Sequence, residues 1–125
     1  MRKILFRGKR LYNCGWVFGG FHSRFGQSFI IGISKKLRID GIQVYTETVG
    51  QYTGLTDKNG TKIFEGDVIM YGLIPCVVKW EEENARFMLY EKGVYLRNGF
   101  NADTMKLKEV IGNIHDNPEL LEVTE

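Results

Sequence analysis

The sequence predicts a mainly β protein, in which short strands fold into a small open barrel or pseudo-barrel with one or two short helical turns. Three observations predict this class: short runs of aromatic and β-branched residues recur along the chain, fifteen glycines supply positions for turns, and helix signals are few. The length of 125 residues predicts a single domain, 1–125, with a basic N-terminal part (1–48) and a barrel-like part (49–125).

The first half of the chain contains four apolar runs of strand length. Residues 4–6 and 16–18 lie on either side of a loop, and they predict a first hairpin. Residues 29–33 and 42–45 predict two further strands. No strand–loop–helix pattern follows the local glycines, so we expect them to serve turns and close strand approach rather than to hold a phosphate. These glycines are Gly15, Gly19, Gly20 and Gly26.

The second half shows the two-residue period of a half-buried strand at residues 76–81 and again at 87–90. A turn is expected at 91–93 and a late strand at 110–114. Two short helical turns are also expected. One lies within 101–108, with Asn101 or Asp103 as its cap, and the other starts at Pro118, because proline suits the first helical position. In the first alternating run, one face carries Cys76, Val78 and Trp80 and the other carries Val77, Lys79 and Glu81.

The stretch DKNG, residues 57–60, predicts the tip of a hairpin. Asp57 stands where a side chain accepts bonds from backbone N–H groups, and Asn59 and Gly60 are residues that tolerate positive φ. The rival interpretation is a cation site, because Asp, Asn and Thr occupy the first, third and fifth places of an EF-hand loop. Lys62 stands where that loop needs glycine and Val68 where it needs a bidentate glutamate, so we predict a turn and no metal.

The next three residues, Glu65, Gly66 and Asp67, predict a corner of the barrel. Gly66 permits a sharp reversal of the chain, and Asp67 can accept bonds from the amides that the reversal exposes. Glu65 and Asp67 also stand at alternate positions, as a catalytic carboxylate pair would. No base, nucleophile or metal ligand accompanies them in the sequence, so the structural interpretation is preferred and no catalytic residue is predicted.

The whole stretch GQYTGLTDKNGTKIFEGDVI resembles the hallmark of the YopX family, small proteins encoded by bacteriophages and prophages. The opening RKILFR, the segment 15–19 (GWVFG) and the end 109–121 (EVIGNIHDNPELL) are also similar to that family. The resemblance implies a mainly β pseudo-barrel, with the hallmark in the part 49–125, and a phage or prophage origin. It implies no activity and brings no catalytic or binding residues, because the family has no established biochemical function.

Charge is distributed unevenly along the chain. Residues 1–50 hold nine Lys and Arg against two Asp and Glu, a net charge of +7, whereas residues 51–125 hold eight against thirteen, a net charge of −5. Such a division predicts either an anionic partner for the first half or self-association between unlike halves. The acidic run 81–83 is expected to be solvated at a strand end, and it could also pair with the basic half of a neighbouring subunit in a symmetric oligomer.

Basic and aromatic residues interleave between positions 2 and 38, a pattern found in small β-barrels that bind nucleic acid. The competing interpretation is that the aromatic side chains form a core and the charges form a solvated face. The candidate nucleic-acid contacts are Arg7, Lys9, Arg10, Trp16, Lys35, Lys36 and Arg38.

Cysteine and histidine give no metal or catalytic pattern. Cys14 and Cys76 lie far apart, and no apolar stretch has the length of a secretory signal or a membrane span, so we expect free thiols in or near the core of a cytoplasmic protein. A Cys–His pair of Cys14 with His22, or of Cys76 with His115, stays open on sequence alone. No CxxC or HxxxH spacing is present, and we predict no metal and no cofactor.

Two functions are therefore expected of a protein of this kind. The first is that of a non-enzymatic phage or prophage accessory protein, cytoplasmic in the bacterial host, which self-associates or binds a host or phage protein and no membrane. The alternative is a small nucleic-acid-binding β-barrel that uses the basic, aromatic first half.

Overall fold

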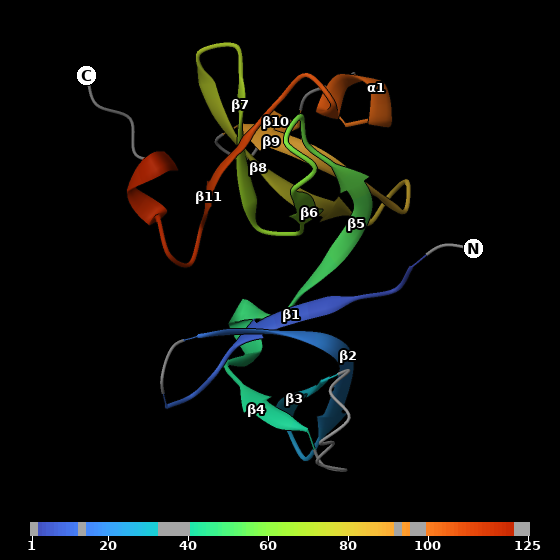
Figure 1. The fold of residues 1–125 in the computed structure, drawn as a ribbon, viewed down its shortest axis with the longest axis vertical. Coiled ribbons are helices and arrows are strands. Elements are labelled where there is room, and N and C mark those ends of the chain that lie inside the picture. The colour runs from blue at the N-terminus through green and yellow to red at the C-terminus, as the bar shows by residue number, and fades with distance from the viewer. Residues whose placement is uncertain (1–2, 13–14, 33–40, 92–93, 96–99, 122–125) are drawn as a thin grey trace. The chain divides into compact units, whose positions relative to one another are not determined.

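The structure is a computed structural model that describes residues 3–12, 15–32, 41–91, 94–95 and 100–121. The chain forms two compact units, Met1–Tyr52 and Thr53–Glu125 (Figure 1). The organisation of 1–125 as a single domain stays a prediction. Each unit is described below by itself.

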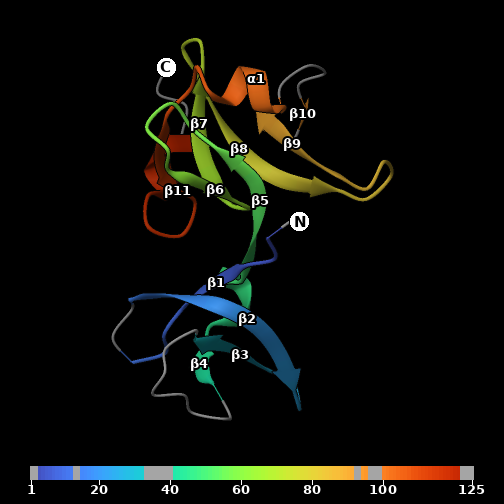
Figure 2. The same ribbon diagram turned by 45° about the vertical axis from the view of Figure 1, so that its right-hand side comes forward.

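The first unit contains strands of an antiparallel sheet in the order β4-β3-β2-β1-β5, of which β5 starts in this unit and ends in the second (Figures 1 and 2). The expected first hairpin is confirmed, because Arg7 of β1 pairs with Phe18 of β2. A short 3-10 helix, η1 (Thr46–Thr48), joins β4 to β5. The strands are β1 (Phe6–Lys9), β2 (Trp16–Arg24), β3 (Gln27–Gly32), β4 (Ile42–Val44) and β5 (Gly50–Thr56).

Strand β2 is much longer than the expected run 16–18, and it ends in a two-residue turn. Phe25 and Gly26 both have positive φ, of 52° and 75°, as a type I′ hairpin turn requires. Gly19 and Gly20, which were expected in turns, lie instead inside β2 and face Gly32 and Ile31 of β3. Of the two expected roles, turns and close strand approach, the turn is therefore wrong for these two glycines, because the ladder to β3 continues through both.

The core of the first unit lies where β1, β3 and β4 approach one another. Ile30 and Val44 are 0% and 2% exposed. A Cβ atom on Gly8 would come within 2.8 Å of a Val44 methyl group, so glycine is the residue that lets the two backbones approach this closely. The Lys9 amide donates to the Thr48 hydroxyl at 2.9 Å, and this bond attaches η1 to β1.

The second unit contains a five-stranded antiparallel sheet with the order β10-β9-β8-β7-β11. Strand β6 (Lys62–Phe64) lies beside the end of β5, where the Thr53 hydroxyl donates to the Ile63 carbonyl at 2.8 Å. The sheet strands are β7 (Asp67–Tyr71), β8 (Ile74–Glu81), β9 (Arg86–Glu91), β10 (Val94–Tyr95) and β11 (Val110–Asn113). The helical turns are α1 (Ala102–Met105) and the 3-10 helix η2 (Pro118–Leu121).

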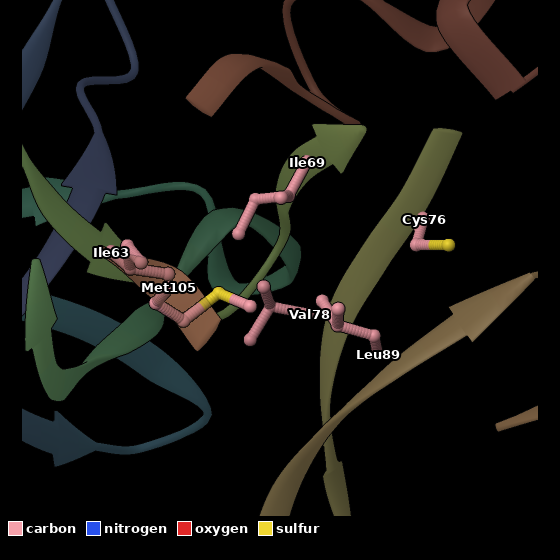
Figure 3. Close-up of a cluster of buried hydrophobic side chains, with 6 residues drawn as sticks. All are labelled: Ile63, Ile69, Cys76, Val78, Leu89 and Met105. Atoms are coloured by element: carbon pink, nitrogen blue, oxygen red, sulfur yellow. The ribbon is translucent and has the colours of Figure 1, made fainter. Parts of the chain in front are cut away.

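Both expected helical turns are present. Helix α1 starts after Asn101, whose side-chain oxygen accepts the Thr104 amide at 2.8 Å and so caps the helix. Its last residue, Met105, is fully buried, and Figure 3 draws it together with the other side chains of the core cluster. This core cluster consists of Ile63, Ile69, Cys76, Val78, Leu89 and Met105.

The predicted fold class is confirmed: the protein is mainly β, with two antiparallel sheets and only short helical segments in the described part of the chain. Within that part, no sheet closes into a barrel, which agrees with the open form of the prediction. No helix among the described residues has both the length and the apolar character that a membrane-spanning helix needs.

The end of β8 departs from the expected alternation. Trp80 is 41% exposed and packs edge-on against Phe87, whereas Glu81, which was expected in a solvated acidic run, is buried. The Glu81 carboxylate accepts bonds from the Asn84 side chain at 2.9 Å and the Arg86 guanidinium at 2.7 Å, and these bonds lower its pKa. The expectation was wrong because the β8–β9 turn brings two donors back over the strand end.

Cys76 should not react with thiol reagents while the protein is folded. The side chain is fully buried, and burial raises the pKa of the thiol, with a smaller contribution from the charge of Glu91. In a Cys14→Ser variant, we expect Ellman's reagent to label Cys76 only at denaturant concentrations that unfold the second unit. Labelling that is equally fast in native buffer would contradict the buried position.

Candidate functional site

The hallmark hairpin is organised around the carboxylate of Asp57, which is 4% exposed. One oxygen, Oδ1, accepts the amides of Asn59 at 2.8 Å and Thr61 at 2.9 Å. The other, Oδ2, accepts the amide of Val110 from β11 at 3.0 Å. The Gly60 amide donates to the Asp57 carbonyl at 3.0 Å, and Gly60 has a φ of 80°. The carboxylate therefore joins the hairpin tip to a strand that lies far along the chain.

The same contacts determine the charge state of Asp57. Burial alone would raise the pKa of the carboxyl group, but the amides of Val110, Thr61 and Asn59 together outweigh burial and hold the pKa below its ordinary value. A carboxylate whose oxygens accept three backbone amides stabilises a turn and does not have the bonding of a calcium ligand. We call the Asp57 carboxylate with the amides of Asn59, Thr61 and Val110 the turn clasp. Among the described residues, no three His, Cys, Asp or Glu side chains are grouped as a metal site would require.

The corner at residues 65–67 is built in a similar way. Asp67 is buried, and its Oδ2 accepts the Phe64 amide at 2.8 Å. Gly66 has a φ of 93°, donates its amide to Val78 and accepts the Ile114 amide. The two residues thus hold β6, β7, β8 and the end of β11 together. The carboxylate of Asp67 lies in the interior and bonds the backbone, which is the geometry of a structural group.

A second constellation lies on one face of the first sheet, and we call it the basic–aromatic face. Its members alternate along β2 and face partners on β1 and β3: Arg7 pairs with Phe18, Lys9 with Trp16, and His22 with Phe29. Residues that pair directly across an antiparallel sheet point to the same side of it. The face consists of Arg7, Lys9, Trp16, Phe18, Gly20, His22, Arg24 and Phe29.

Cations lie against aromatic rings at both ends of this face. The Arg7 guanidinium lies 4.5 Å from the centre of the Trp16 ring, and the Lys9 ammonium lies 5.7 Å from it. At the other end, the Arg24 guanidinium lies 5.7 Å from the Phe29 ring. Such contacts hold the cationic groups against the rings, and the Arg7 side chain is buried.

The structure brings together only some of the predicted nucleic-acid contacts. Arg7, Lys9 and Trp16 meet on the basic–aromatic face. Arg10 lies beyond the end of β1, where it forms an isolated bridge to Val44. Lys35, Lys36 and Arg38 lie outside the described residues.

Five residues of the face were not selected as contacts from the sequence: Phe18, Gly20, His22, Arg24 and Phe29. Alternation along 16–24 was the available signal, but the glycines inside the run obscured it.

The remaining candidate pairs acquire no catalytic geometry from the described residues. Cys76 lies in the core, and its thiol is directed to the Ile74 carbonyl at 3.7 Å. The His115 amide donates to the Asn113 side chain at 3.0 Å in the loop before η2. Cys14, the possible partner of His22, lies outside the described residues.

Comparison with known proteins identifies the family. The family described as YopX protein matches residues 20–122, which include the whole hallmark and most of the chain. The protein belongs to the YopX family. The similarity inferred from residues 50–69 and 109–121 is thereby confirmed, and the opening residues 2–7 and the segment 15–19 lie outside the matched range.

A solved structure has the same architecture as this YopX protein. Protein EF1440 from Enterococcus faecalis matches with a TM-score of 0.64 and 26% sequence identity, over 98% of this chain and 100% of that one. No curated protein matches the chain. The name of the similar structure states no activity, so function has to be argued from the residues of this chain itself.

Proposed function

We propose that this YopX protein is a non-enzymatic accessory protein of a bacteriophage or prophage, which acts in the cytoplasm of the bacterial host by self-association. One observation carries the proposal: the two compact units have opposite charge. Met1–Tyr52 holds nine Lys and Arg against two Asp and Glu, and Thr53–Glu125 holds eight against thirteen. The basic unit of one copy is therefore complementary to the acidic unit of another.

The exposed acidic side chains are the ones available for such a contact. Asp57, Asp67 and Glu81 are buried and bond groups of their own chain. Glu82 and Glu83, by contrast, are exposed at the β8–β9 turn. A contact between the basic unit of one copy and the acidic unit of another can be made twice in a two-fold dimer, or it can repeat into rings or open chains.

Light scattering across a salt series tests the proposal. We expect a mass above the 14.4 kDa of one chain at low salt and a mass near one chain at about 1 M salt, where the screening length falls to about 3 Å. The double variant Glu82→Lys/Glu83→Lys should reduce the low-salt mass, whereas Leu107→Ala, a neutral exposed change, should leave it unaltered. A single-chain mass at every salt concentration would refute self-association.

A further inference from the structure

In the middle of β2, the basic–aromatic face has an open space above Gly20, which we call the step. Gly20 lies between Phe18 and His22 on that face, and a Cβ atom placed on Gly20 would have nothing within 4 Å. Its φ lies outside the left-handed region, so neither conformation nor packing requires glycine here. Glycine inside a strand lowers its stability, and it often marks a place where a ligand approaches the backbone. The flanking Phe18 side chain is 47% exposed.

The dimensions of the step suit a flat ring. Phe18 and His22 are four positions apart along the strand, which corresponds to about 13 Å of backbone. Ile31 faces Gly20 from β3 and supplies an apolar floor beside the step. An aromatic or heteroaromatic ring placed over Gly20 would therefore contact Phe18 on one side and His22 on the other.

Positive charge surrounds the step. Lys9 lies on the β1 side of the face beside the buried Arg7, and the exposed Arg24 lies at the far end of β2. The first 39 residues of the chain include no Asp or Glu, so no carboxylate of this segment opposes an anionic ligand. An apolar protein surface would form no favourable contact with these cations. A polyanion with flat rings would contact the cations through its charges and the step through a ring.

The turn at the end of the same hairpin is built against local preference. Phe25 is 93% exposed and has a φ of 52°, in a turn position where asparagine or glycine is favoured. A bulky residue in the left-handed region costs stability, and such outliers persist at functional sites. An exposed phenylalanine in this conformation next to Arg24 has no role in the core of the unit. A contact with a partner accounts for both its exposure and its strain.

From these observations we propose that the β2–β3 hairpin binds single-stranded nucleic acid. One base lies over Gly20 between Phe18 and His22, and another stacks on Phe25. Lys9 and Arg24 contact the phosphates on either side. Single strands are favoured over duplexes because a paired base cannot leave its stack to lie over the step. This inference does not depend on self-association, since it rests on the first unit alone.

Fluorescence anisotropy with fluorescein-labelled dT12 and rU12 at about 50 mM salt tests the inference. We expect binding to both, with an affinity that falls steeply as salt rises. Gly20→Val, which fills the step and stays compatible with a strand, should weaken binding about tenfold, as should Phe18→Ala. Two matched controls should bind as the wild type does. These are Ser23→Val, an exposed position on the opposite face of β2, and Leu73→Ala, an exposed apolar residue between β7 and β8.

Phe25→Asn separates binding from folding. Because asparagine suits the left-handed turn position, we expect this variant to unfold at a higher urea concentration while its affinity for dT12 falls about tenfold. If the role of Phe25 is purely structural, Phe25→Asn should change the stability and leave the affinity for dT12 unchanged. That result would overturn the assignment of Phe25 as a residue that stacks on a base.

Where binding is detected, three outcomes would still overturn the inference as a whole: equal affinity of Gly20→Val and the wild type, equal affinity for a duplex, or competition by poly-glutamate as effective as that by unlabelled dT12. The last outcome would indicate an acidic protein as the partner. Absence of binding from a protein that still self-associates would refute this inference and leave the proposed function intact. Binding by a protein that is monomeric at every salt concentration would support this inference and refute the proposed self-association.

Discussion

Replacing Asp57 with alanine should destabilise the second unit by about 3 kcal/mol. The change removes both acceptors of the turn clasp and leaves the Asn59, Thr61 and Val110 amides without their carboxylate partner. A hydrogen bond to a charged group contributes about 1.5–3 kcal/mol, and a buried donor left unsatisfied costs a further ~1–3 kcal/mol, partly recovered by relaxation and water. Urea unfolding followed by the fluorescence of Trp80 measures the change in the free energy of unfolding.

The control for this prediction is Asn59→Ala, two residues away. The Asn59 side chain is exposed, and the residue takes part in the clasp through its backbone amide, which alanine retains. We expect a loss below about 0.5 kcal/mol, as for ordinary surface substitutions. Similar losses for Asp57→Ala and Asn59→Ala would show that the clasp contributes little to stability.

Asp57 should also make stability depend on pH in the acidic range. Its pKa in the folded protein lies below the ordinary value of 3.8, so the unfolded chain binds the proton more readily. The contribution of the carboxylate is therefore fully present above pH 3.8 and is lost as the pH falls through the lower folded value. The stability difference between the wild type and Asp57→Asn should shrink over that range. A difference that stays constant down to pH 2 would contradict the shifted pKa.

Replacing Met105 with alanine should cost about 3 kcal/mol, the typical loss when a fully buried methionine leaves a cavity. The side chain is 0% exposed and joins α1 to the cluster that includes Ile63 and Val78 (Figure 3). Leu107→Ala is the matched control, because Leu107 lies two residues away and is 78% exposed. We expect less than about 0.5 kcal/mol for the control, measured by the same urea unfolding.

Equal effects of Met105→Ala and Leu107→Ala would mean that α1 does not anchor the core. A large effect of Met105→Ala with an unchanged slope of the urea transition would indicate a loss of packing in a unit that still unfolds cooperatively.

Local sequence signals predicted those parts of the fold that depend on neighbouring residues. The DKNG tip, the Asn101 cap and the Pro118 turn each need residues within a few positions of one another, and the structure contains all three. Local signals of that kind do not predict contacts between residues that are far apart in the sequence. The third donor to Asp57 comes from Val110, 53 positions later, and nothing in the hallmark sequence indicates that strand.

The basic–aromatic face could be predicted only in part for a related reason. Placing Arg7 beside Trp16 requires the register of β1 on β2, and placing Arg24 beside Phe29 requires the turn at Phe25. Composition showed that cations and rings interleave, but a shift of one residue in either register would place them on opposite faces. The burial of Glu81 likewise depends on where the β8–β9 turn returns Arg86.

The bond between Asp57 and Val110 also has a consequence for the order of events at the ribosome. Every strand pairing among the described residues up to Tyr52 is available once Tyr52 has left the exit tunnel. The clasp of the second unit has to wait until Val110 emerges, which at about 5–20 residues per second is several seconds later. During translation, the hallmark hairpin therefore lacks the bond from the Val110 amide to Asp57 for that interval.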